Sequence, residues 1–190
     1  ETNQDIAESA NQITISAWVK PTFSDFTPQL VAVSKNLTFK ILINNIEEPH
    51  RVPIFAIYDG ITWHQALGTE PLVENQWHHI AGVVDGSKIT IFVDAKQGES
   101  IAIPELFLVN EQGKLQESEM GISISQDDVV IGAEYDDASK IATSKFTGKI
   151  AGVTIHSKAL DTEFIKEVLQ NTTPYSITEI NLTETVHISD

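Results

Sequence analysis

Apolar and polar residues alternate along many short stretches of this chain, and this two-residue period limits the fold more than any other feature. In residues 13–20, Ile13, Ile15 and Ala17 fall on one side of an extended strand, while Thr14, Ser16 and Trp18 fall on the other. Similar stretches recur throughout the 190 residues. Strands are therefore expected at residues 13–20, 37–44, 53–58, 61–67, 77–84, 89–93, 129–131, 147–155 and 180–188.

Turn and helix signals complete this pattern. Asp-Gly pairs at residues 59–60 and 85–86 are typical of tight hairpin turns. Convincing helical spacing occurs once, at residues 160–170, where Asp161 is suited to cap the first turn. Residues 95–125 are less regular and predict a long, partly strand-forming excursion. Many short strands with a single short helix predict an all-β, two-sheet antiparallel sandwich.

The chain is predicted to be one domain over residues 1–190, with residues 176–190 as a terminal strand segment. Its 27 acidic and 12 basic residues give a net charge of −15, which repels nucleic acids. No apolar run approaches the roughly 20 residues that cross a bilayer, so membrane insertion is not expected.

The chain contains no cysteine, which excludes disulfides and thiolate metal sites. Glycosylation sequons begin at Asn36, Asn171 and Asn181 and favour an extracellular or cell-surface setting.

Several motifs together resemble one fold family. They are the strand ITISAWVKP at residues 13–21, the strand and turn WHHIAGVVDG at 77–86, IFVD at 91–94, and FTGKI at 146–150 leading to Leu160. These resemble, in family order, the concanavalin A-like jelly rolls of the laminin-G-like and pentraxin-like group. The resemblance implies a jelly-roll sandwich, a fold that carries lectins, adhesion modules and hydrolases.

The pentraxin branch of this group suggests a calcium site. Its members follow a strand ending in Gly with a Glu, a main-chain carbonyl and an Asp that bind calcium, and residues 131–136 fit that frame. By resemblance, Glu134 and Asp136 would be side-chain ligands and Tyr135 would supply its carbonyl. Asp137 adds a further carboxylate, and hard oxygen ligands of this kind suit calcium.

The early Asp-Asn pair of pentraxins has no counterpart near residues 36–39, so a single calcium is expected rather than two. A solvated acidic loop without a metal is the alternative interpretation of residues 134–137.

The histidine and tryptophan residues are further candidates for a site. His78 and His79 point to opposite faces of a strand, so they cannot chelate one metal together, and one exposed imidazole is expected. Trp18 and Trp77 are expected in the core. Trp63, beside the Asp59 turn, is the best candidate for an aromatic residue that binds a ligand.

A glycoside hydrolase is the main enzyme alternative. Glu134-Tyr135-Asp136 begins the Glu-x-Asp pattern of retaining glucanases, but Ala138 and Ser139 occupy the place of the second Glu. Catalysis is therefore not expected.

The sequence favours a non-catalytic, calcium-associated binding or adhesion module that recognises carbohydrate or a cell-surface protein. The alternative is a structural module of a surface layer or filament, in which terminal strands pair between copies. That alternative implies a homo-oligomer or a place within a larger surface protein.

Overall fold

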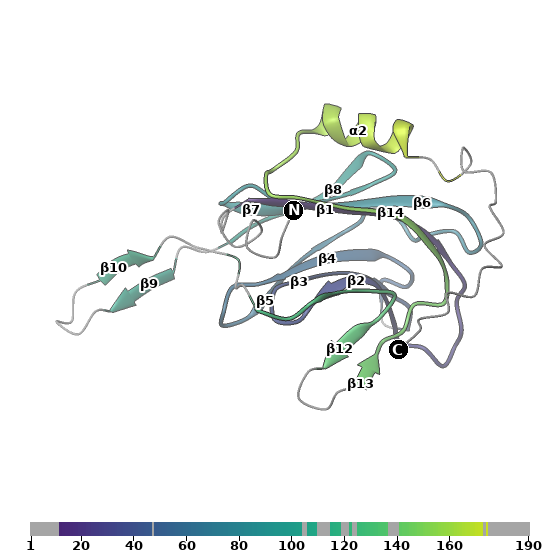
Figure 1. Ribbon diagram of the computed structural model, residues 1–190, viewed down its shortest axis with the longest axis horizontal. Coiled ribbons are helices and arrows are strands. Elements are labelled where there is room, and N and C mark those ends of the chain that lie inside the picture. The colour runs from purple at the N-terminus through teal and green to yellow at the C-terminus, as the bar shows by residue number, and fades with distance from the viewer. Residues whose placement is uncertain are drawn as a thin grey trace, which may run out of the picture.

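In the part of the chain that the structure describes, two five-stranded antiparallel sheets form a sandwich and one α-helix lies on the outside of one sheet (Figure 1). The computed structural model describes residues 12–46, 48–103, 106–109, 115–118, 122, 125–136, 141–172 and 174. The helix-side sheet has the order β14-β1-β6-β7-β8, and the opposite sheet has the order β11-β2-β3-β4-β5. The predicted all-β sandwich is confirmed.

The helix-side sheet contains β1 (Ile13–Pro21), β6 (His78–Val84), β7 (Lys88–Val93), β8 (Lys96–Ala102) and β14 (Gly148–His156). The opposite sheet contains β2 (Gln29–Lys35), β3 (Phe39–Asn44), β4 (Pro53–Tyr58), β5 (Trp63–Leu67) and β11 (Val129–Ile131). Two hairpins lie outside the sheets: β9 (Leu106–Val109) with β10 (Leu115–Ser118), and β12 (Glu134–Asp136) with β13 (Ile141–Thr143). The helix within the described residues is α2 (Thr162–Asn171).

Most expected strands form within one or two residues of their predicted bounds, because apolar residues recur at every second position on their inward faces. Strand β2 was not predicted, since Leu30, Val31, Ala32 and Val33 are all buried and the run shows no alternation. A bulge between Val31 and Val33 shifts the register there. The strand expected at 180–188 lies outside the described residues.

The prediction of an acidic loop was wrong for residues 134–136. Glu134–Asp136 is a strand that pairs with β13, with Tyr135 opposite Ala142, rather than an irregular loop. The excursion expected at 95–125 becomes β8, which joins the helix-side sheet, and the projecting β9–β10 hairpin (Figure 1).

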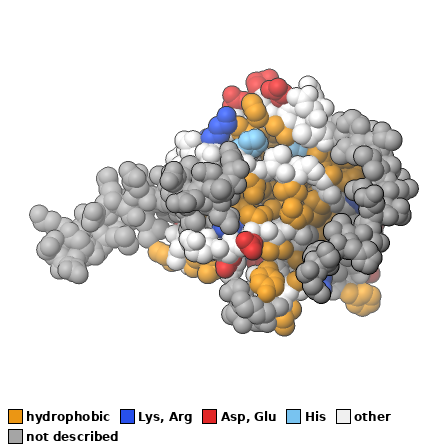
Figure 2. Space-filling model, in the orientation of Figure 1, with side chains coloured by type: hydrophobic (Ala, Val, Ile, Leu, Met, Phe, Trp, Pro, Cys, Tyr) orange, Lys and Arg blue, Asp and Glu red, His pale blue; other side chains and the backbone are white. Residues whose placement is uncertain are grey.

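The core lies between the sheets and is built from the inward residues of both. Ile15, Val19, Ile41, Phe55 and Ile80 belong to it and are fully buried. Figure 2 shows hydrophobic side chains at the centre of the face in view, between the two sheets, and acidic side chains over α2. Among the described residues, no helix has the length and apolar character to cross a membrane.

The outer face of β1 holds α2 at both of its ends. The Thr14 hydroxyl donates to the Lys158 carbonyl at 2.8 Å and accepts from the Leu160 amide at 2.9 Å, just before the helix. After the helix, Trp18 Nε1 donates to Thr172 Oγ1 at 2.9 Å. Trp18 is therefore buried beneath the helix rather than between the sheets.

The helix forms as predicted. The Asp161 carboxylate accepts from the Phe164 amide at 2.8 Å, so it caps the first turn. Ile165 is buried and packs with Leu160, Val83 and Phe92 on the outer face of the helix-side sheet. A helix of this length gains its stability from such docking.

The sandwich spacing depends on a glycine in β6. A Cβ placed on Gly82 would overlap the Phe55 ring, which reaches across from β4. Gly82→Ala is expected to destabilise the fold by about 1–3 kcal/mol through overpacking. Chemical denaturation of Gly82→Ala, Phe55→Leu and the double variant checks this, because the smaller leucine side chain at position 55 relieves the overlap. Additive costs in the double variant would contradict the proposed contact.

Candidate functional site

Two aromatic side chains lie together on the outer face of the opposite sheet. Trp63 in β5 is directly opposite Tyr58 in β4, and both are half-buried. Their ring centroids are 5.4 Å apart with the planes tilted by 47°. Neighbouring residues Ile57 and Ala66 point inward to the core, and strand alternation therefore directs Trp63 and Tyr58 outward.

A charged pair completes this surface. Lys40 Nζ lies 4.5 Å from the centroid of the Trp63 ring and 3.1 Å from Glu134 Oε1. The lysine therefore makes a cation–π contact and an ion pair at once. Tyr58, Trp63, Lys40 and Glu134 are called the aromatic platform below. It combines two aromatic rings with a hydrogen-bond donor and an acceptor.

Glu134, the first of the residues predicted to bind calcium, is itself part of this platform. The Glu134 side chain is engaged by Lys40, which competes with a metal for the carboxylate. Tyr135 follows in β12, while the Asp136 side chain and all of Asp137 lie outside the described part of the structure. Among described residues no three His, Cys, Asp or Glu side chains gather as a metal site. The calcium site stays a prediction that needs Asp136 and Asp137.

Asp59, the other residue predicted to bind a ligand, is used by its own turn. Its Oδ1 accepts from the Ile61 and Thr62 amides at 2.7 Å each, and its Oδ2 lies 2.6 Å from His64 Nε2. Partial burial raises the pKa of Asp59, but the hydrogen bonds from His64 and the two amides outweigh it and hold that pKa below its usual range. Asp59 thus fixes the hairpin that carries Trp63.

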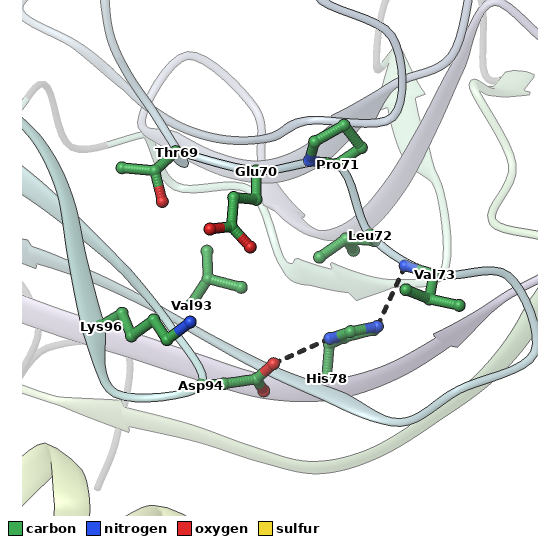
Figure 3. Close-up of a pocket in the computed structure, with 9 residues that line it drawn as sticks. All are labelled: Thr69, Glu70, Pro71, Leu72, Val73, His78, Val93, Asp94 and Lys96. Carbon is green, nitrogen blue, oxygen red and sulfur yellow. Dashed lines mark hydrogen bonds and ion pairs between the residues drawn. The ribbon is translucent and has the colours of Figure 1, made fainter.

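A small pocket of about 110 Å³ lies between the loop before β6 and the β7–β8 turn (Figure 3). His78 Nδ1 lies 2.8 Å from Asp94 Oδ2, and the Val73 amide donates to His78 Nε2 at 3.1 Å. This arrangement requires the Nδ1–H tautomer, in which both ring nitrogens are already hydrogen-bonded. His78 is therefore a clamp between loops and has no free nitrogen for general base catalysis.

The pairing of His78 with Asp94 was not predicted from the sequence. The His78 side chain is 12% exposed and His79 is fully buried, so the prediction that one of the two imidazoles is exposed was wrong. Burial raises the pKa of Asp94, but hydrogen bonds from His78 and from the His79 amide outweigh it and lower that pKa. The sequence signal was IFVD, whose Asp terminates β7 beside the start of β6.

His79 is fully buried beside Trp18 on the outer face of the helix-side sheet. The centroids of the two rings are 5.3 Å apart. Among the described residues neither ring nitrogen of His79 has a hydrogen-bond partner. Burial lowers the pKa of His79 to about 4, although the nearby Asp94 carboxylate opposes that shift. The imidazole is neutral at physiological pH and acts as a packing residue.

Acid is expected to weaken the fold through His79. The unfolded chain takes up the proton below pH 6.5, whereas the folded protein does so only near pH 4, so stability is lost as the pH falls through this window. The corresponding loss by pH 4 is about 3 kcal/mol. Urea denaturation of wild type and His79→Phe at pH 7 and pH 4 checks this. Parallel losses of stability in the two proteins would contradict it.

With this geometry established, comparison with known proteins defines the class of the chain. Residues 2–166 match the laminin-G-like profile of the concanavalin A-like lectin/glucanases superfamily. The chain belongs to that superfamily, as its motifs indicated. No curated protein matches the sequence.

Three solved structures illustrate the similarity. A Bacteroides ovatus protein assigned to carbohydrate binding superposes with a TM-score of 0.61 at 18% identity, covering 83% of this chain and 40% of that one. The heptameric SAP-like pentraxin of Limulus polyphemus gives 0.60 at 15% identity, covering 84% and 70%. Domain 4 of a GH43 extracellular arabinanase from Geobacillus stearothermophilus, in complex with arabinotriose, gives 0.57 at 17% identity, covering 85% and 68%.

At these identities the superpositions establish the fold. This chain spans 40% of the length of the Bacteroides ovatus protein, so that protein's full activity does not transfer with the fold.

Proposed function

We propose that this chain is a non-catalytic carbohydrate-binding module and that its aromatic platform contacts the sugar. The observation that carries the proposal is Trp63, half-buried against Tyr58 on an outer sheet face and accompanied by the Lys40–Glu134 pair. Lys40 lies over the Trp63 ring at 4.5 Å, and in this proposal the opposite face of that ring stacks on the C–H side of a sugar ring. The charged pair supplies a donor and an acceptor for hydroxyl groups.

The charge of the chain narrows the ligand class. A net charge of −15 repels sulfated or carboxylated glycans at a distance, and Lys40 is already neutralised by Glu134. Neutral glycans are therefore the proposed ligands. The names of structural relatives support a sugar ligand: a carbohydrate-binding assignment in one, and arabinotriose bound to another.

The proposal that the module is non-catalytic rests on the contacts of Glu134 and His78. Glu134, the member of the Glu-x-Asp pattern whose side chain is described, is ion-paired with Lys40 instead of being poised as a nucleophile. His78, a candidate base by residue type, has both nitrogens hydrogen-bonded. An extracellular or cell-surface location is proposed together with this function, since the ligands would be found there.

Trp63→Ala is expected to weaken binding to the best neutral oligosaccharide of a glycan panel by about thirtyfold, the usual effect of removing a central aromatic contact. Trp63→Phe keeps a ring at the position and is expected to retain most of the affinity. Isothermal titration calorimetry on both variants checks this, with thermal unfolding to verify the fold. Equal affinity of wild type and Trp63→Ala would contradict the platform as the site.

Calcium is proposed as a single ion at residues 134–137, in competition with Lys40 for Glu134. Calcium is expected to raise the Tm of the wild type, to raise it further in Lys40→Met, and to leave Glu134→Gln unchanged. Thermal unfolding in calcium and in chelator measures all three. If no variant responds, calcium does not belong to the module, and the aromatic platform stands without it.

A further inference from the structure

A second concave surface lies on the other side of the sandwich, between the N-terminal end of α2 and the outer face of the helix-side sheet. The groove has a volume of about 320 Å³. Its floor is apolar and is formed by Val83 in β6, Phe92 in β7 and Leu160 just before α2, all buried. Its rim is polar and contains Asp85, Lys88, Gln97 and Asp161. This volume is at the lower end of the range for small-molecule sites, which is about 300–1,000 Å³.

The first rim carboxylate is fixed by the β6–β7 turn. Asp85 Oδ1 accepts from the Ser87 amide at 3.0 Å, the Ser87 hydroxyl at 2.9 Å and the Lys88 amide at 3.0 Å. Partial burial raises the pKa of Asp85, but these hydrogen bonds outweigh it, so the pKa is lowered and the group is ionised. Its Oδ2 lies 3.8 Å from Lys88 Nζ, beyond hydrogen-bond distance, and is able to accept from a ligand.

The second rim carboxylate is fixed by the helix. Asp161 Oδ1 caps α2 by accepting from the Phe164 amide at 2.8 Å. The segment that carries Asp161 is tied to β1 by the two hydrogen bonds of the Thr14 hydroxyl. Each carboxylate therefore uses one oxygen to hold its backbone position and retains the other as an acceptor at the rim of the groove.

We propose that this groove is a second sugar site, which takes one neutral pyranose ring, and this inference rests on the carbohydrate-binding function proposed above. The apolar floor suits the C–H face of the ring. The rim offers acceptors from Asp85 and Asp161 together with donors from Lys88 and Gln97.

The mixture of donors and acceptors selects the ligand class. A sugar hydroxyl both donates and accepts, so it uses both kinds of rim group. An ammonium group only donates, which leaves the Lys88 ammonium unused. An anion meets two carboxylates on a chain of net charge −15. A single ring fits the volume better than a chain, so the site is suited to the terminal residue of a glycan.

The test uses Asp→Asn changes that preserve structure. Asn supplies the same Oδ1 acceptor for the turn at residue 85 and for the cap at residue 161, but it replaces the second acceptor oxygen with an NH₂ donor. Glu163→Gln is the matched control, because Glu163 lies in the same helical turn, does not line the groove and pairs with Lys166.

The isotope-labelled protein is titrated with methyl glycosides of glucose, galactose, mannose, N-acetylglucosamine and arabinose. Two-dimensional NMR records the shifts of its backbone amides. Amides of residues 83–92 and 159–164 are expected to shift with at least one of them. Affinity at these amides should fall about tenfold or more in Asp85→Asn and in Asp161→Asn, and stay unchanged in Glu163→Gln and in Trp63→Ala.

The outcomes separate the two sites. Shifts around Trp63 without shifts at the groove would overturn this inference and leave the proposed function intact. Shifts at the groove alone would support it and move the sugar site away from the aromatic platform. Groove shifts that persist in both Asn variants, or that arise with N-acetyl-lysine methylamide but with no glycoside, would overturn the sugar assignment.

Discussion

Burial of both faces of β1 is the constraint on which the rest of the structure depends. Its inward residues, such as Ile15 and Val19, are fully buried between the sheets. Its outward residues Thr14 and Trp18 are buried as well, because they hold the two ends of α2 by hydrogen bonds. A polar side chain buried in this way needs a hydrogen-bond partner close to it in space. The position of the helix is therefore fixed by the sequence of a strand more than 140 residues away in the chain. The groove beside α2 exists because the helix is held there.

Aspartates at chain reversals perform one task repeatedly in this molecule. Asp59, Asp85 and Asp161 each accept backbone hydrogen bonds through one oxygen, which fixes a hairpin turn or the start of a helix. The second oxygen differs between them. It binds His64 at Asp59, whereas at Asp85 it lines an open groove. A residue type that is ordinary for a turn therefore becomes a candidate ligand contact only where concave surface lies beside it.

The sequence was sufficient for the fold because alternation and turn chemistry are local. Residues 53–58 and 129–131 form strands with the predicted bounds, and Asp161 caps the helix. The failures occurred where tertiary contacts decide. Strand β2 carries apolar residues on both of its buried faces and so lacks alternation. Glu134–Asp136 extends because β13 pairs with it.

The candidate site was harder to predict from the sequence than the fold. Trp63 was predicted to bind a ligand from its place beside a hairpin turn, and this stays a prediction. The sequence gives no sign that Lys40 from β3 contacts both Trp63 and Glu134. Likewise, the IFVD strand end contained Asp94, yet its pairing with His78 depends on the register between β6 and β7. Such juxtapositions join residues far apart in the chain, and they follow only from the sheet order.

The two proposed sugar contacts lie on the outer faces of opposite sheets, so they point away from each other across the sandwich. One short glycan cannot reach both contacts. Simultaneous occupation of the two contacts therefore requires two glycan chains or two branches of one large polysaccharide. A sheet face with a half-buried ring suits the interior of a glycan chain, which can run across it in either direction. A small groove with a closed floor suits a chain end. A module built in this way would link separate glycans, and the gain in avidity from two weak contacts would come from that linkage instead of from tight binding at either one.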